Sequence, residues 1–177
     1  RRYREAMADF ERALELDPDD AWTIARRGEV LCEMGRYREA LDEFSRAIEL
    51  DPDDAWIVAH RGEVHRLMEW EEDALADFDR AIELSPGDGW AIGRRGEARR
   101  LTGLHREALE DLDKAVELNP DDAWIIARRG ETHRDLGEFE EALADLDRAV
   151  ELAPGDAWAI ARRGETYRRL GRYKEAL

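Results

Sequence analysis

The sequence predicts an all-α solenoid of antiparallel helix hairpins, and three observations support this fold class. The first is a strict 34-residue period in the tryptophans, at Trp22, Trp56, Trp90, Trp124 and Trp158. The second is that all five prolines keep the same period, at Pro18, Pro52, Pro86, Pro120 and Pro154. The third is that apolar residues recur at helical spacing between these marks. A fixed period of this length is typical of stacked repeats, each of which buries its apolar face only against its neighbours.

The period divides the chain into one array of four complete repeats with a partial repeat at each end. Complete repeats are predicted at residues 21–54, 55–88, 89–122 and 123–156, a lone second helix at 1–20, and a partial repeat at 157–177. In the repeat 123–156, we expect a first helix from Ala123 to Leu136 and a second from Phe139 to Leu152. Because both ends fall within a repeat and solenoids need polar caps, we expect a fragment of a larger protein that can associate end to end.

The predicted helix ends carry residues with known capping roles. An aspartate precedes each first helix, where its carboxylate can accept from unpaired N–H groups, at Asp20, Asp54, Asp88, Asp122 and Asp156. Glycine follows four of the five first helices, where a left-handed residue is favoured, at Gly35, Gly103, Gly137 and Gly171. Glu69 takes this place in the remaining repeat. The prolines close the second helices because proline has no N–H to continue the helix.

Mid-helix glycines predict the seam within each hairpin. Glycine costs about 1 kcal/mol relative to alanine in a helix unless another backbone needs the space. We therefore expect Gly28, Gly62, Gly96, Gly130 and Gly164 to contact second helices, with Ala40, Ala74, Ala108 and Ala142 as close neighbours. The antiparallel hairpin also places the arginine before each glycine opposite an acid. The expected ion pairs are Arg27 with Glu43, Arg61 with Asp77, Arg95 with Asp111 and Arg129 with Asp145.

These residues resemble the tetratricopeptide repeat, a 34-residue helix-turn-helix with a small glycine in the first helix, alanines and an aromatic residue or leucine in the second, and a closing proline. The chain departs from that pattern in the arginines before the glycines, where the family usually has leucine. It also departs where Leu31, His65, Arg99 and His133 replace aromatic residues.

The resemblance implies a right-handed α-solenoid whose first helices line a concave groove that binds peptides or proteins. The family's carboxylate clamp of Lys, Asn and Arg has no match. Its columns hold small residues (Ala25, Ala59, Gly93, Ala127 and Ala161) and glutamates instead. The near-identical, arginine-rich repeats resemble arrays in bacterial multidomain signalling proteins.

Composition and motifs limit the function classes. The net charge of −16 disfavours nucleic acid and anionic lipid and favours basic or mixed-charge protein partners. The single cysteine, Cys32, and the absence of an apolar run of about 18 residues predict a cytoplasmic protein without a membrane partner. No phosphate loop, H-E-x-x-H motif or nucleophile elbow occurs, so we expect neither an enzyme nor a cofactor. His60 and His65 are five positions apart and diverge around a helix, so no metal site is expected.

The candidate binding surface is a column of aromatic and charged residues on the first helices. A helical wheel places each tryptophan away from the packed glycine and beside a glutamate. The predicted groove residues are Trp22, Trp56, Trp90, Trp124, Trp158, Glu29, Glu63, Glu97, Glu131, Glu165, Arg94, Arg100, Arg128 and Arg134. Two interpretations of the tryptophans stay open: they anchor a partner, or they cover the preceding helix and stack on arginine.

The function predicted from these features is a non-catalytic scaffold that binds a peptide or protein in the groove, as part of a larger signalling or sensor protein. The alternative is single-stranded nucleic acid binding through tryptophan stacking and arginine contacts. The acidic net charge disfavours it, as does the glutamate three residues from each groove arginine.

Overall fold

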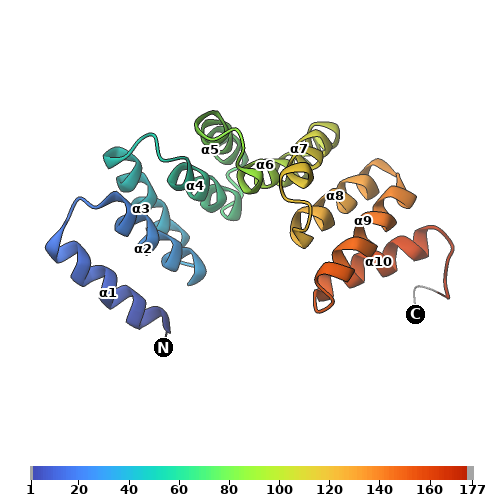
Figure 1. Cartoon of the computed structure of the whole chain (residues 1–177), viewed down its shortest axis with the longest axis horizontal. Coiled ribbons are helices and arrows are strands. Elements are labelled where there is room, and N and C mark those ends of the chain that lie inside the picture. Colours follow the sequence, from blue (N-terminus) through green and yellow to red (C-terminus); the bar gives the residue numbers. More distant parts are fainter. Residues whose placement is uncertain (1, 175–177) are drawn as a thin grey trace. The chain divides into compact units, whose positions relative to one another are not determined.

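The computed structural model describes residues 2–174, which are all-helical and contain no strand (Figure 1). The helices are α1 (Arg2–Leu16), α2 (Ala21–Glu33), α3 (Tyr37–Leu50), α4 (Ala55–Leu67), α5 (Glu71–Leu84), α6 (Gly89–Leu101), α7 (His105–Leu118), α8 (Ala123–Leu136), α9 (Phe139–Leu152) and α10 (Ala157–Arg169). The predicted all-α class is confirmed. The second helix expected after residue 173 falls on residues 175–177, outside the described part.

The chain divides into an N-terminal unit, residues 1–86, and a C-terminal unit, residues 87–177. In the N-terminal unit, α2 pairs with α3 and α4 with α5, while α1 packs on α2 and α3 on α4. In the C-terminal unit, α6 pairs with α7 and α8 with α9, while α7 packs on α8 and α9 on α10. Successive first helices also touch within each unit. Such contacts between neighbouring hairpins define an α-solenoid.

The caps lie where the sequence predicts them. Asp54 accepts from the N–H groups of Trp56 and Ile57 at 2.8 and 3.1 Å, and Asp88, Asp122 and Asp156 cap α6, α8 and α10 in the same way. Asp20 caps α2 by accepting from the N–H of Trp22 and the hydroxyl of Thr23. The four turn glycines all adopt positive φ, between 71° and 84°. Among the described residues, Glu69 is the one non-glycine with positive φ, at 60°. A side chain in this conformation is strained because its Cβ approaches the following carbonyl.

The mid-helix glycines lie against the second helices, but in two different ways. A Cβ on Gly96 would stand 2.9 Å from Leu112 Cγ and 3.2 Å from the carbonyl oxygen of Ala108, and Gly130 repeats this arrangement. A Cβ on Gly28 would meet the ring of Phe44 at 3.2 Å, and Gly62 likewise meets a phenylalanine ring. The backbone of a predicted alanine neighbour is thus among the nearest groups in the C-terminal unit, whereas a phenylalanine ring and the Cβ of Glu43 or Asp77 are nearest in the N-terminal unit.

Four of the five residues in the small-residue column are buried and do not line a groove, in contrast to what the resemblance implied. Ala25, Ala59 and Ala127 are at most 1% exposed, and Gly93 is buried as well. A Cβ on Gly93 would approach Ile125 on the next first helix to 3.3 Å, so the next hairpin packs on this residue. Ala161, on the last described helix, is exposed.

The four predicted ion pairs within the hairpins are confirmed. Arg27 donates to both carboxylate oxygens of Glu43 at 2.7 and 2.8 Å. Arg61, Arg95 and Arg129 each donate to their aspartate at 2.6 Å, the partners being Asp77, Asp111 and Asp145.

Each of these three aspartates also has a second basic neighbour, which the sequence analysis missed. His65 lies 2.9 Å from Asp77, Arg99 donates to Asp111 at 2.8 Å, and His133 lies 3.9 Å from Asp145. These bases stand where the family usually has aromatic residues. In the repeat whose acid is Glu43, the same position holds Leu31, which is 3% exposed and belongs to the core.

Candidate partner-binding surface

In the C-terminal unit, tryptophan and arginine side chains alternate along the first helices. The Arg94 Cζ atom lies 5.1 Å from the ring centroid of Trp90 and 3.9 Å from that of Trp124. Arg128 repeats this with 5.3 Å to Trp124 and 3.9 Å to Trp158. Arg162 lies 5.6 Å from Trp158. These six residues, the C-terminal ladder, make cation–π contacts both within a repeat and between successive repeats.

The N-terminal unit carries a shorter ladder of Trp22, Arg26, Trp56 and His60. Arg26 Cζ lies 5.5 Å from the Trp22 ring and 5.4 Å from the Trp56 ring. The His60 ring centroid lies only 3.8 Å from that of Trp56, and its Nδ1 is 2.8 Å from the Trp56 carbonyl oxygen. Trp56 packs against the core of this unit, whereas Trp22 is 58% exposed. Both ladders thus combine indoles with flat, nitrogen-rich groups.

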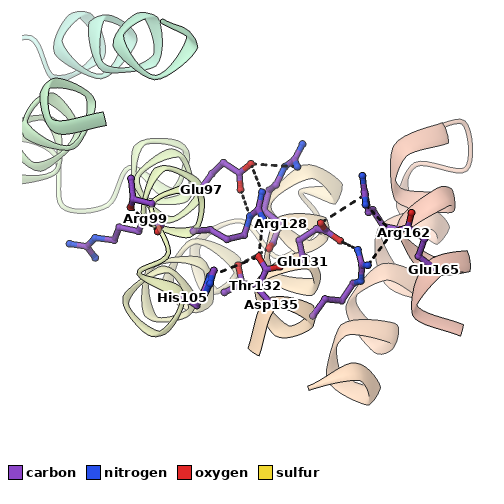
Figure 2. A network of polar contacts seen from close by, with 12 residues as sticks. Glu97, Arg99, His105, Arg128, Glu131, Thr132, Asp135, Arg162 and Glu165 are labelled. Atoms are coloured by element: carbon purple, nitrogen blue, oxygen red, sulfur yellow. Dashed lines mark hydrogen bonds and ion pairs between the residues drawn. The ribbon is translucent and has the colours of Figure 1, made fainter. Parts of the chain in front are cut away.

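In the C-terminal unit, the predicted glutamates Glu97, Glu131 and Glu165 lie in a layer of ion pairs with arginines, which include Arg128 and Arg162 of the ladder (Figure 2). Glu97 and Glu131 are buried, at 5% and 7% exposure. Arg100 donates to both carboxylate oxygens of Glu97, at 2.8 and 3.2 Å, and Arg134 donates to one carboxylate oxygen of Glu131. These two carboxylates are buried and already paired with arginines. They therefore hold the arginines in position and are not available to bind a partner directly.

Further pairs in this layer join successive repeats. Arg128 reaches back to Glu97 at 3.5 Å and Arg162 to Glu131 at 3.9 Å. Arg134 donates forward to Glu165 at 3.0 Å, and Arg100 to Asp135 at 2.9 Å. Burial alone would lower the pKa of Arg100, but Glu97 and Asp135 outweigh it and raise that pKa above its ordinary value. Arg100 therefore stays charged, and the arginines of the layer connect neighbouring hairpins.

The predicted groove residues fall into two sets in the structure. The indoles and the arginines Arg94 and Arg128 form the ladders, whereas Arg100, Arg134 and the glutamates form the ion-pair layer. In the N-terminal unit, Glu29 pairs with Arg26 and Glu63 with Arg66, both at 2.7 Å. Stacking on arginine, one of the two interpretations of the tryptophans, occurs in both units. It is compatible with partner binding because the indoles are not fully buried.

The predicted set omitted five residues that belong to this surface. Arg26, His60 and Arg162 share the sequence column of Arg94 and Arg128, and Arg66 shares that of Arg100 and Arg134, so the 34-residue period could have identified them. Asp135 had no such signal, since its column holds Glu33, Leu67, Leu101 and Arg169 elsewhere.

The structure of residues 2–174 was also searched for metal sites, membrane-spanning helices and a reactive thiol. No group of three or more His, Cys, Asp or Glu in residues 2–174 could hold a metal ion. No helix among them is both long enough and apolar enough to cross a membrane. Burial and, to a lesser extent, Glu63 raise the pKa of the Cys32 thiol to about 11. This thiol is therefore protonated and a poor nucleophile at neutral pH.

The geometry defines the chain as a helical-repeat protein, and sequence comparison gives its family. Tetratricopeptide repeat profiles match residues 1–59, 91–122 and 123–156. Together these matches span more than half of the chain, which belongs to the tetratricopeptide repeat family. Arrays of this family are protein-interaction scaffolds and are typically non-catalytic. No protein of curated function matches the chain.

Solved structures with the same fold have varied roles. YrrB, described as a tetratricopeptide repeat protein with an unusual peptide-binding site, is 27% identical with a TM-score of 0.71, covering 95% of this chain and 87% of its own. PilW, a type IV pilus biogenesis factor, is 21% identical with a TM-score of 0.90, covering 98% and 81%. A human IFIT1 dimer solved with m7Gppp-AAAA is 19% identical with a TM-score of 0.82, covering 98% and 44%. At such identities, PilW and IFIT1 show the fold alone.

Proposed function

We propose that this chain binds a peptide or protein partner along the face of the first helices, with the ladder of each unit serving as a contact surface. The observation that carries the proposal is the periodic stack of indoles and guanidinium groups, which leaves Trp22 58% exposed. Aromatic and arginine side chains beside a polar rim supply most of the energy in protein interfaces. Glu29, Glu63, Glu97, Glu131 and Glu165, with Arg100 and Arg134, hold this surface in place.

Charge and stacking favour a protein partner over single-stranded nucleic acid. Arg128 and Arg162 already pair with glutamates, so they are poorly placed to neutralise phosphates. The indoles of Trp56, Trp124 and Trp158 each contact two of the chain's own cationic or imidazole groups. A base would have to displace one of these groups in order to stack. The net charge of −16 adds long-range repulsion.

The proposal includes a cellular setting. Near-identical arginine-rich repeats support a role within a larger signalling or sensor protein. The cytoplasm suits the chain because a single cysteine stays reduced there. The peptide-binding site of YrrB supports a peptide ligand, since that protein shares the fold over 95% of this chain.

A random peptide library displayed on phage tests the proposal directly. We expect enrichment of peptides that bind the full chain and lose about thirtyfold in affinity with Trp124→Ala, as expected when about 2 kcal/mol of anchor energy is lost. Trp70→Ala is the matched control, because Trp70 is 44% exposed but lies outside the ladders. Enriched peptides that bind the folded Trp124→Ala and Trp158→Ala variants unchanged would exclude the ladder as the site.

A mobility shift with a twelve-residue oligothymidine at about 50 mM salt tests the nucleic-acid alternative, since such binding is strongest at low salt. A shift together with no peptide enrichment would overturn the proposal. Sedimentation velocity of the free chain tests end-to-end association. Association would appear as a sedimentation coefficient that increases with protein concentration.

A further inference from the structure

Trp70 is the one tryptophan that departs from the 34-residue period. It immediately precedes α5 and lines an open cavity of about 550 Å³ together with Glu71, Glu72 and Asp73. The His65 ring lies against the indole, with the ring centroids 5.9 Å apart and the planes inclined by 25°, yet 44% of Trp70 stays exposed. In the described part of the chain, no guanidinium stacks on this indole, in contrast to the ladder tryptophans. Trp70 therefore presents an uncovered aromatic surface to the cavity.

The three acidic residues of this cavity have no cation of their own. Glu71, Glu72 and Asp73 are exposed, and none of them forms an ion pair with another described residue. Arg61 feels the charge of Asp73, but it donates its hydrogen bonds to Asp77. An aromatic ring bordered by unpaired carboxylates attracts a cation in two ways, through the negative face of the ring and through the charges beside it.

The preceding repeat shows how a guanidinium fits at this turn. The 34-residue period aligns Trp70 with Arg36 and Asp73 with Glu39. Arg36 donates to both carboxylate oxygens of Glu39, at 2.7 and 2.6 Å. In the next repeat, tryptophan takes the place of this arginine, so the carboxylate of Asp73 remains but its guanidinium does not. A guanidinium from outside the chain can occupy the free place and lie on the indole as well.

We infer that the cavity beside Trp70 binds an arginine side chain of a basic protein partner, with the guanidinium stacked on the indole and paired with the carboxylates. Arginine suits this site better than lysine, because its planar guanidinium stacks on aromatic rings and pairs with a carboxylate through two parallel hydrogen bonds. The net charge of −16 attracts a basic partner at long range. This site goes beyond the proposed function, since Trp70 lies outside both ladders.

NMR titration of the isotope-labelled full chain with capped peptides tests the site. The peptides are Ser-Gly-Arg-Gly-Ser and its versions with lysine or citrulline, which keeps the shape of arginine without its charge. We expect the arginine peptide to shift the indole N–H signal of Trp70, which is identified by its loss in Trp70→Leu. It should bind about tenfold more tightly than the citrulline peptide and about threefold more tightly than the lysine peptide. Equal binding of the arginine and citrulline peptides, or of the arginine and lysine peptides, would overturn the inference.

Variants locate the bound arginine. Trp70→Leu keeps an apolar side chain but removes the ring, and it should weaken binding of the arginine peptide about tenfold. The double variant Glu71→Gln, Asp73→Asn should weaken it by a similar factor, because it removes two of the carboxylates. Trp70→Phe keeps a ring and should bind within about threefold of the unchanged chain, which separates loss of the ring from misfolding.

The ladder variant separates this inference from the proposed function. Trp124→Ala, in the C-terminal unit, should leave binding of the arginine peptide unchanged. If the arginine peptide loses affinity with Trp124→Ala and not with Trp70→Leu, arginine binds the ladder, so this inference fails and the proposed function stands. If the arginine peptide depends on Trp70 while library peptides bind without Trp124, this inference stands and the proposed function fails.

Discussion

The N-terminal and C-terminal units carry the same ladder built from different groups. In the C-terminal unit, a guanidinium lies 3.9 Å from the indole of the next repeat at both Trp124 and Trp158. In the N-terminal unit, the corresponding Arg26 lies 5.4 Å from Trp56, and the close contact comes from the His60 ring at 3.8 Å. The column that holds arginine at residues 26, 94, 128 and 162 thus holds His60 in the second repeat, and the ring of His60 lies against the indole of its own repeat.

The two units also differ in the residue of the second helix that packs against the mid-helix glycine. Phe44 and Phe78 lie against the glycines of the N-terminal unit, whereas Leu112 and Leu146 do so in the C-terminal unit. With the flatter phenylalanine ring, the nearest atoms to a Cβ at Gly28 are all side-chain atoms. With leucine, a backbone carbonyl oxygen of the second helix stands 3.2 Å from the Cβ site. A methyl group at the mid-helix glycine therefore meets only side-chain atoms in the N-terminal unit but also meets backbone in the C-terminal unit.

The largest expected difference concerns the buried acids. Asp111→Leu removes the carboxylate shared by Arg95 and Arg99 and should lower the free energy of unfolding by about 3 kcal/mol, because two partly buried guanidiniums lose their partner. Glu43→Leu affects only Arg27, beside the apolar Leu31, and should cost about 1 kcal/mol. Urea denaturation measures both. Glu110→Leu, at an exposed site on α7, serves as the control, and equal losses for the two acids would contradict the comparison.

Alanine at the mid-helix glycines should give the next largest effect. Gly96→Ala should destabilise the chain by about 1–2 kcal/mol, since Leu112 and the Ala108 carbonyl leave no room for a methyl group. Gly28→Ala should change stability by less than about 0.5 kcal/mol, because a gain in helix propensity offsets a mild contact with Phe44. Thermal denaturation distinguishes them, with Gly155→Ala as a control where a Cβ meets nothing within 4 Å. A tolerated Gly96→Ala would show that α6 and α7 can separate easily.

Asp77 should make the free energy of unfolding depend on pH in the acid range. The stability lost on acidification should be smaller than that lost in Gly96→Ala. Burial would raise its pKa, but hydrogen bonds from Arg61 and His65 outweigh burial and hold the pKa below its ordinary value. A lowered pKa means that the folded state binds fewer protons. The stabilisation is therefore complete above about pH 4, the ordinary pKa, and is lost as the pH falls through the folded pKa. Melting temperatures from pH 7 to pH 2 should fall less steeply for Asp77→Asn, and parallel profiles would refute the assignment.

The smallest expected effect lies in the turns. Glu69→Gly should stabilise the N-terminal unit by about 0.5 kcal/mol, because glycine relieves the strain of a positive φ at some cost in unfolded-chain entropy. Gly137→Ala, the reverse change in the C-terminal unit, should destabilise by about 1 kcal/mol. Urea midpoints measure both changes. A destabilising Glu69→Gly would mean that the Glu69 side chain makes a contact worth more than the strain.

Local signals predicted much of the fold and part of the surface. The aspartate caps, the turn glycines and the four ion pairs within hairpins follow from helix geometry and from one antiparallel register, both of which can be read along the chain. The tryptophan column was found for the same reason. The second base on each buried aspartate was missed because His65, Arg99 and His133 stand where the family usually has aromatic residues, and this position alone does not indicate a partner on the second helix.

The sequence by itself determined the hairpins, because helix period, caps and breakers act over a few residues and recur every 34. Only the tertiary structure decided how one hairpin lies on the next. It buried Glu97 and Glu131, placed Gly93 against Ile125 of the next first helix, and brought Arg94 and Arg128 over the indoles of the following repeat. These contacts depend on the rotation and offset between neighbouring helices, which arise from the summed packing of many side chains and have no local marker in the sequence.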